Sequence, residues 1–227
     1  MASEISVVIP LGGDGARAPD LATMLGGERP LETVVAAGPD VGAEALDTWR
    51  QHGARVLPGG PRSRGARLRL ASDQTRGSTL LFLHADTRLP PGGLSLVTGA
   101  VRQGATWGAF RLGFADPDRR LSVVAAVANA RSRMTRIPYG DQALFCTRQG
   151  YQRAGGHPDW PLLDDVELAR RLKRLTAPWL LAAPVRTSGA KYLTRGVARQ
   201  VLANWSILLR YAAGASPESL AARYWGR

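Results

Sequence analysis

The first half of the sequence alternates short apolar runs with segments of helical spacing, and this alternation allows few folds. Four apolar runs are predicted to be buried strands, at Ile5–Pro10, Glu32–Ala37, Ala54–Leu57 and Ser78–His84. Helices are predicted between them, at Val41–Gly53 and Arg64–Gly77. Continuous apolar strands that alternate with helices are typical of a parallel sheet covered on both faces. Ligands of such sheets bind beyond the carboxyl ends of the strands.

The second half of the sequence has a mixed pattern. Strands are predicted at Thr106–Phe114 and Asp141–Thr147. Three helices are predicted, at Arg120–Met134, Asp164–Leu175 and Gly196–Gly214. We find no repeat and no linker, so we predict a single domain over residues 1–227, in which the second half completes a cleft with the first.

The net charge restricts the kinds of molecule that the protein can bind, and the cysteine content restricts its cellular compartment. The 227 residues carry a net charge of +12, which suggests a nucleotide, a polyanion or an acidic membrane surface as partner. All but two of the 30 Lys and Arg residues are Arg, so compositional bias is an equally open explanation. The single Cys146 excludes an intramolecular disulfide and a cysteine zinc cluster. We see no signal peptide and no run of ~18–20 apolar residues, so we expect a cytoplasmic protein that is soluble or lies on a membrane surface.

The fourth predicted strand ends abruptly in the sequence His-Ala-Asp-Thr, which places His84 and Asp86 at the carboxyl edge of the sheet. A carboxylate at this position is a candidate ligand for Mg²⁺, which proteins hold with one or two carboxylates together with substrate phosphates. An aspartate after a strand also forms turns and helix caps, so this residue alone does not establish a metal site.

Two further segments carry candidate chemistry. Asp164 and Glu167 have the spacing of a capping box, whereas Asp165 beside them is a candidate general base. Neighbouring carboxylates resist ionisation, which is one way to tune such a base. Tyr139 and Asp141 flank a glycine before a strand, an arrangement that suits the recognition of a sugar or ring but also forms plain turns.

A Gly-rich segment, Gly12–Leu21, follows the first strand and has two interpretations. Its backbone N–H groups are suited to hold a phosphate. It lacks the lysine of a P-loop, and a flexible turn explains it without a ligand.

Taken together and in order, five segments resemble one family. They are LLFLHADTRLPPG, WGAFRL, ARSRMTRIPYGDQALF, GGHPDWPLLDDVELARRL and VLANWSILLRYAAGASPESLAARY. They resemble the family-two inverting glycosyltransferases, most closely the small bacterial subgroup of the arsenosugar-biosynthesis type, and the resemblance is dense over Ser78–Tyr224. It implies a GT-A fold: an α/β protein with a Rossmann-like, mostly parallel mixed sheet flanked by helices, and with C-terminal helices. Residues at about 1–105 would bind the nucleotide, and residues at about 106–227 the acceptor.

The resemblance also implies substrates and residue roles. It implies a nucleotide-diphosphate-sugar donor, a hydroxyl acceptor of unknown identity and Mg²⁺ or Mn²⁺ as cofactor. Asp86 would bind the metal, His84 would stand in place of the first acidic residue of the D-x-D motif, and Asp165 would be the base with Asp164 as its neighbour. The candidates for donor binding are His84, Asp86, Asp40, Arg64 and Arg67. The candidates for acceptor binding are Trp107, Tyr139, Gly140, Asp141 and Gln142.

The sequence departs from the family in its donor half. The first strand is followed by no Asn-Glu pair, Ala37 takes the place of an aspartate that contacts the nucleotide, and only Asp40 is nearby. Two alternatives therefore stay open: a nucleotidyltransferase of similar fold, and a non-catalytic relative with a degraded donor site.

The long C-terminal helix has a broad apolar face flanked by arginines. Trp205, Leu209 and their neighbours are expected either to pack on the domain or to rest on an anionic membrane. No nucleic acid partner is expected.

Overall fold

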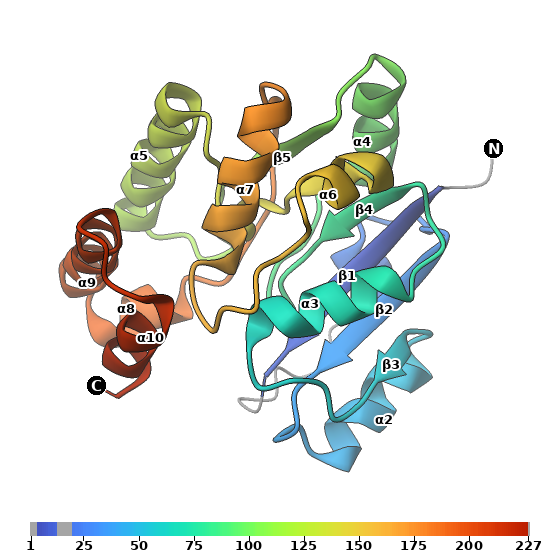
Figure 1. Cartoon of the computed structure of the whole chain (residues 1–227), viewed down its shortest axis with the longest axis horizontal. Coiled ribbons are helices and arrows are strands. Elements are labelled where there is room, and N and C mark those ends of the chain that lie inside the picture. Colours follow the sequence, from blue (N-terminus) through green and yellow to red (C-terminus); the bar gives the residue numbers. More distant parts are fainter. Residues whose placement is uncertain (1–3, 13–19, 227) are drawn as a thin grey trace.

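The structure, a computed structural model, describes residues 4–12 and 20–226 and is built on one seven-stranded sheet (Figure 1). The strands are β1 (Ile5–Leu11), β2 (Glu32–Ala37), β3 (Arg55–Leu57), β4 (Thr79–Phe82), β5 (Trp107–Arg111), β6 (Phe145–Thr147) and β7 (Trp179–Pro184). Their order across the sheet is β3-β2-β1-β4-β6-β5-β7, so both halves of the sequence contribute strands to it.

Helices flank this sheet and continue beyond its last strand. They are α1 (Leu21–Met24), α2 (Ala43–Gln51), α3 (Arg64–Asp73), α4 (Gly93–Arg102), α5 (Arg119–Thr135), α6 (Arg148–Arg153), α7 (Asp164–Leu175), α8 (Ala190–Arg195), α9 (Val197–Ala212) and α10 (Pro217–Trp225). In Figure 1 the helices α8, α9 and α10 gather at one end of the molecule, next to α5 and α7. The predicted α/β architecture with C-terminal helices is confirmed.

The sheet is mixed, and the one reversed strand has a consequence for the site. β1 pairs in parallel with β2 and β4, β2 with β3, and β5 with β7, whereas β6 is antiparallel to both β4 and β5. The carboxyl ends of all the other strands therefore meet at the edge where β6 begins. The turn η1 (Gly140–Gln142), which leads into β6, is thereby brought to the edge at which β4 ends.

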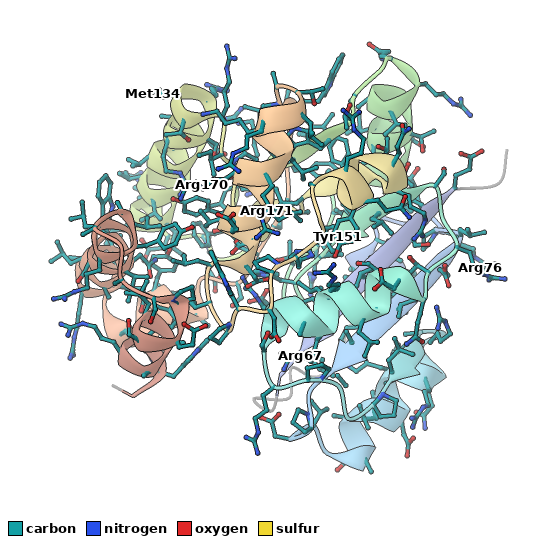
Figure 2. All side chains as sticks on the ribbon, viewed as in Figure 1. Arg67, Arg76, Met134, Tyr151, Arg170 and Arg171 are labelled. Atoms are coloured by element: carbon teal, nitrogen blue, oxygen red, sulfur yellow. The ribbon has the colours of Figure 1, made fainter. Side chains whose placement is uncertain are left out.

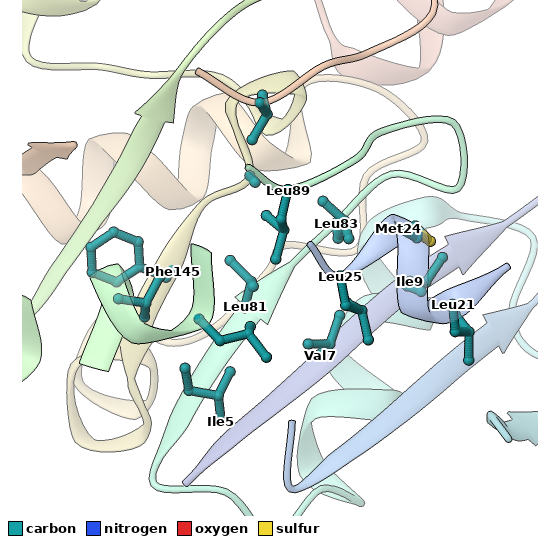
Figure 3. Close-up of a cluster of buried hydrophobic side chains, with 14 of the residues drawn as sticks. Ile5, Val7, Ile9, Leu21, Met24, Leu25, Leu81, Leu83, Leu89 and Phe145 are labelled. Carbon is teal, nitrogen blue, oxygen red and sulfur yellow. The ribbon is translucent and has the colours of Figure 1, made fainter. Parts of the chain in front are cut away.

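Burial explains why the predicted strands form. Side chains alternate across a strand, so β1 contributes Val7 and Ile9 to one core cluster (Figure 3) and Val8 to a second one. Full burial of one such side chain stabilises a fold by roughly 1.5–3 kcal/mol. Within the described residues, no helix is both long enough and apolar enough to cross a bilayer.

The helix α5 is fixed to the end of β5 by one buried amide. Asn129 Nδ2 donates to the Leu112 carbonyl at 3.0 Å, and its Oδ1 accepts from the Leu112 N–H at 2.8 Å. Leu112, Leu121 and Ala125 form a small apolar cluster beside this amide. The position of α5 relative to the carboxyl edge of the sheet is therefore set by both packing and hydrogen bonds.

Candidate active site at the carboxyl edge of the sheet

The start of α7 holds the two acidic residues singled out in the sequence. Leu163, with φ of 63°, precedes the helix and provides no side-chain cap, so the capping box considered for Asp164 and Glu167 does not form. Carboxylates in the first helical turn interact favourably with the positive end of the helix dipole. Asp164 and Asp165 are therefore compatible with the helix start, and their side chains are directed to other partners.

Arg64, the first residue of α3, connects both carboxylates. Its Nε and Nη2 lie 2.8 and 2.7 Å from Asp164 Oδ1, and Nη2 lies 2.9 Å from Asp165 Oδ1. The sequence placed Arg64 at the rim of the donor site. The structure places its guanidinium between these two carboxylates, joining the beginnings of two helices that lie 100 residues apart.

The two carboxylates differ in their affinity for a proton. Burial raises the pKa of Asp164, whose Oδ2 is buried without a hydrogen-bond partner. Burial also acts to raise the pKa of Asp165, but Arg64 and the Gly140 N–H outweigh it and hold that pKa below its ordinary value. The expectation that crowding resists ionisation therefore holds for Asp164 and is wrong for Asp165, because Arg64 compensates the charge.

Asp165 from α7 and His84, which follows β4, both lie beside Gly140, the first residue of η1. The Gly140 N–H donates to Asp165 Oδ2 at 2.6 Å. A Cβ at position 140 would lie 2.8 Å from this oxygen and 3.1 Å from His84 Nε2, so both side chains approach the glycine closely. Burial, followed by the charge of Arg64, lowers the pKa of His84, and the imidazole is therefore neutral at pH 7.

Asp86 lies beyond β4 and is exposed. Its Oδ1 is 3.3 Å from the Thr87 hydroxyl and 3.4 Å from the Thr187 hydroxyl. It forms no ion pair with any residue that the structure describes, although its charge acts to raise the pKa of His84 and of Asp141. Asp86 is therefore an available carboxylate within electrostatic range of the other acidic groups.

Asp141, in η1, is a second carboxylate whose pKa is raised. Burial raises its pKa to about 6, Arg131 opposes the rise, and the charges of Asp165 and Asp86 add to it. Arg131 from α5 stacks over the ring of Tyr139, with its guanidinium carbon 3.2 Å from the ring centroid. Asp86 and Asp165 therefore lie close enough to Asp141 to act on its charge, at the carboxyl edge of the sheet.

A divalent cation would find a limited set of ligands at this point. Among residues 4–12 and 20–226, no three His, Cys, Asp or Glu side chains are placed to hold a metal ion together. Of the described carboxylates around His84, Asp86 is the one that is exposed and forms no ion pair. This set fits a Mg²⁺ or Mn²⁺ ion that is held by one carboxylate and completed by substrate phosphates, and it does not fit a closed protein cage.

Two of the expected acceptor residues are placed inside the protein. Gln142 Nε2 donates to the Phe110 carbonyl at 3.0 Å, and its Oε1 accepts from the Ser132 hydroxyl at 2.6 Å. Trp107 is fully buried, and its indole N–H donates to the Thr176 carbonyl. The polar atoms of both side chains are bonded within the protein and are not free to bind an acceptor. Both residues therefore have a structural role beside the site.

The remaining donor candidates lie beyond β2 and β3. Arg67 belongs to α3 (Figure 2) and is buried, and its Nη1 donates to the carbonyls of Pro61 and Arg62. Asp40 is exposed, and its charge acts on the pKa of Arg67. Most of the Gly-rich segment Gly12–Leu21 lies outside the described residues.

Sequence reasoning assigned no role to Arg131 or Thr187. Arg131 belongs to one of the segments that carry the family resemblance, but nothing in its spacing on a helix indicates that it would stack over Tyr139. Thr187 lies in no recognised motif and reaches Asp86 only because the segment after β7 returns to the sheet edge.

The fold, but not the sequence, matches known proteins. The sequence matches no protein-family model and no curated protein. S. aureus TarS (residues 1–349) superposes with a TM-score of 0.60 at 15% identity, over 83% of this chain and 61% of that chain. The mannosyltransferase PcManGT from Pyrobaculum calidifontis, in complex with GDP-Man and Mn²⁺, gives 0.60 at 17% identity over 81% and 55%. Glucosyl-3-phosphoglycerate synthase from Mycobacterium tuberculosis, in complex with Mn²⁺, UDP and glucosyl-3-phosphoglycerate, gives 0.57 at 16% identity over 88% and 77%.

The chain therefore has the GT-A fold, as its sequence predicts. It spans about three fifths of TarS residues 1–349 and just over half of the mannosyltransferase. Identities of 12–17% define a shared fold, whereas the activity has to be argued from the site itself.

Proposed function

We propose that this protein is an inverting, metal-dependent glycosyltransferase of family two, which moves a hexosyl-type sugar from a nucleotide diphosphate to an acceptor hydroxyl. The observation that supports the proposal most strongly is that Asp165 accepts from the Gly140 N–H, beside Asp141, at the carboxyl edge of a GT-A sheet where β4 ends and Asp86 follows. This edge is where open α/β sheets bind their ligands. Neighbours of the same fold were crystallised with UDP or GDP-Man and with Mn²⁺.

In the proposed reaction, the acceptor oxygen attacks the anomeric carbon while the bond from that carbon to the diphosphate oxygen breaks. Asp165 takes the acceptor proton, and the nucleoside diphosphate leaves with the bonding electron pair. Asp165 is suited to this role because Arg64 keeps it ionised, so it is free of a proton at neutral pH. Attack opposite the leaving group inverts the anomeric centre.

The other residues of the site hold the reactants. A bound Mg²⁺ or Mn²⁺ would neutralise charge on the departing diphosphate, and Asp86 is the side chain that would hold it. His84 is neutral and adjoins Asp165, so it adds no charge that would repel the cation. Tyr139 with Arg131 stacked on it forms one wall beside Asp141, on the acceptor side.

Two other interpretations compete with this function. A nucleotidyltransferase would use the Gly-rich segment after β1, and no described contact favours it. A non-catalytic relative would have lost donor binding, as Ala37 at the end of β2 suggests. The arsenosugar subgroup, a cytoplasmic location and contact with a membrane stay predictions from the sequence.

Calorimetry with UDP, GDP and their sugar conjugates, with and without Mn²⁺, separates these functions. The glycosyltransferase is expected to bind at least one nucleotide diphosphate more tightly with Mn²⁺ and to release that diphosphate when a sugar is transferred. Turnover of a nucleoside triphosphate with a sugar phosphate would instead identify a nucleotidyltransferase. Absence of binding across the panel would identify the non-catalytic relative.

Gly140→Ala is expected to lower kcat by about 10²-fold. The added methyl would lie 2.8 Å from Asp165 Oδ2 and must displace that carboxylate, and a shift of about 1 Å in a catalytic group costs roughly this factor. Gly99→Ala in α4 is the control, because a Cβ there meets nothing within 4 Å. Equal sugar-transfer rates in the two variants would contradict the contact between Gly140 and Asp165.

A further inference from the structure

A long groove runs between α5 and α9 and opens at the candidate site. Its volume is about 1220 Å³, which exceeds the ~300–1,000 Å³ usual for small-molecule pockets. The side chains along it are mostly apolar and come from both helices. Those that define it best are Val123, Val124 and Val127 from α5 and Val201, Trp205 and Leu208 from α9.

The groove is continuous with the acceptor side of the proposed reaction. Arg131, Tyr139 and Asp141 are among the residues that line it. Gly140, which lies between Tyr139 and Asp141 in the sequence, donates its N–H to Asp165 Oδ2 at 2.6 Å. A molecule lying in the groove would therefore present one end to the proposed base.

The chemistry of the lining indicates the chemistry of the occupant. Val127 and Trp205 are each 52% exposed, and Leu209 is 65% exposed, so the groove keeps a large apolar surface in water. A sugar or another polar acceptor needs hydrogen-bond partners, and the amide of Asn204 is already bonded to Tyr192 and Gln200. The charged residues of the lining are Asp141 and the arginines.

We propose that the acceptor is an amphiphile whose hydrocarbon chain or ring system lies between α5 and α9 and whose hydroxyl group reaches Asp165. This inference rests on the proposed function, because it names the acceptor class of the same reaction. The hydrocarbon part covers the exposed valines and Trp205, while the hydroxyl gives its proton to Asp165 as its oxygen bonds to the anomeric carbon.

The charges of the groove argue against a second copy of the chain as the occupant. Arg120, Arg131 and Arg199 line it. A symmetric dimer formed through this face would bring the arginines of the two copies together, which costs free energy at an interface. A neutral hydroxylated amphiphile meets no such repulsion.

Alkyl glucosides with chains of 6 to 12 carbons, used below their micelle concentration, are the probe for this site. Binding is followed by tryptophan fluorescence without donor or metal, and Trp205→Phe identifies the signal from the groove. Each added methylene is expected to tighten binding about fourfold, as burial of one methylene predicts. An affinity that does not change with chain length would overturn the proposal.

Two variants of α5 test the position of the chain. Val127→Asp places a charge in the groove and is expected to weaken dodecyl glucoside binding at least tenfold. Ala130→Asp adds the same charge to an exposed position that does not line the groove, and it is expected to bind as the parent does. Equal affinities in the two variants would overturn the proposal, as would a parent dimer that Val127→Asp converts to monomer.

Transfer assays separate this inference from the proposed function. The KM for dodecyl glucoside should rise in Val127→Asp, whereas Mn²⁺-dependent nucleotide diphosphate binding stays unchanged. Donor binding and transfer to short acceptors without dependence on chain length would refute the amphiphile and keep the glycosyltransferase. Chain-length-dependent binding without any donor binding would refute the glycosyltransferase, and with it the acceptor role of the groove.

Discussion

Asp165→Asn is expected to lower kcat for sugar transfer by about 10²–10⁴-fold, the range that general-base assistance contributes. The amide cannot take the acceptor proton. It leaves the position of the side chain nearly unchanged, because its oxygen can still accept from the Gly140 N–H. Steady-state kinetics measures kcat and KM, and the KM for the donor is expected to change little.

Glu167→Gln is the matched control for this variant. It also removes one carboxylate from the first turn of α7, so it has the same effect on the helix dipole. Glu167 bonds Arg171 and Tyr211 and is not among the groups that surround Gly140. A loss of kcat in Glu167→Gln equal to that in Asp165→Asn would show that helix stability, and not the base, is responsible.

The pH dependence distinguishes Asp165 from its rival Asp141. The lowered pKa of Asp165 keeps it ionised through the neutral range, so it imposes no change in kcat near pH 6. The pKa of Asp141 is about 6, so a rate that used Asp141 as the base would fall as the pH drops through 6. With Asp165 as the base, kcat is expected to show no such acid limb, and Asp141→Asn is expected to keep most of kcat at pH 8. A loss of kcat at pH 8 in Asp141→Asn, but not in Asp165→Asn, would identify Asp141 as the base.

The parallel half of the sheet could be predicted because each strand is a continuous apolar run buried on both faces. β1, β2 and β4 appear where the sequence predicts them, within a few residues at their ends. β7 was not predicted, since it is a strand at the edge of the sheet whose residues are mostly only partly buried. The strand expected at Asp141–Thr147 is shorter and begins at Phe145, because Gln142 bonds back to the Tyr139 N–H and closes a turn.

The residues of the candidate site could be predicted more readily than the hydrogen bonds and ion pairs that they form. Asp86 and His84 follow from the abrupt end of an apolar run, and Asp165 from its family motif. Arg64 binds both carboxylates and so connects α3 to α7, although these residues lie 100 positions apart in the sequence. A local sequence pattern cannot predict a contact over that separation. The burial of Gln142 and Trp107 likewise depends on how β5, β6 and α7 pack, so sequence alone assigned them to the acceptor.

Asp86→Asn is expected to abolish the increase in nucleotide diphosphate affinity that Mn²⁺ produces, a loss of at least about 100-fold. The reason is that, among the residues that the structure describes, Asp86 is the exposed carboxylate next to His84 and Asp141 that forms no ion pair, and a metal contact to phosphate oxygens contributes several kcal/mol. Its long hydrogen bonds to Thr87 and Thr187 contribute little to folding, so the thermal midpoint should stay within a few degrees.

Titration of UDP or GDP into the parent and the variant, each with Mn²⁺ and with EDTA, measures this effect. EDTA should reduce the parent to the affinity of Asp86→Asn and should leave the variant unchanged. Asp40→Asn provides the comparison, because Asp40 is also exposed in the donor half but lies beyond β2. It is expected to weaken binding by the same factor with and without Mn²⁺. A metal-dependent increase that survives in Asp86→Asn and disappears in Asp40→Asn would move the cation to the end of β2, away from Asp165.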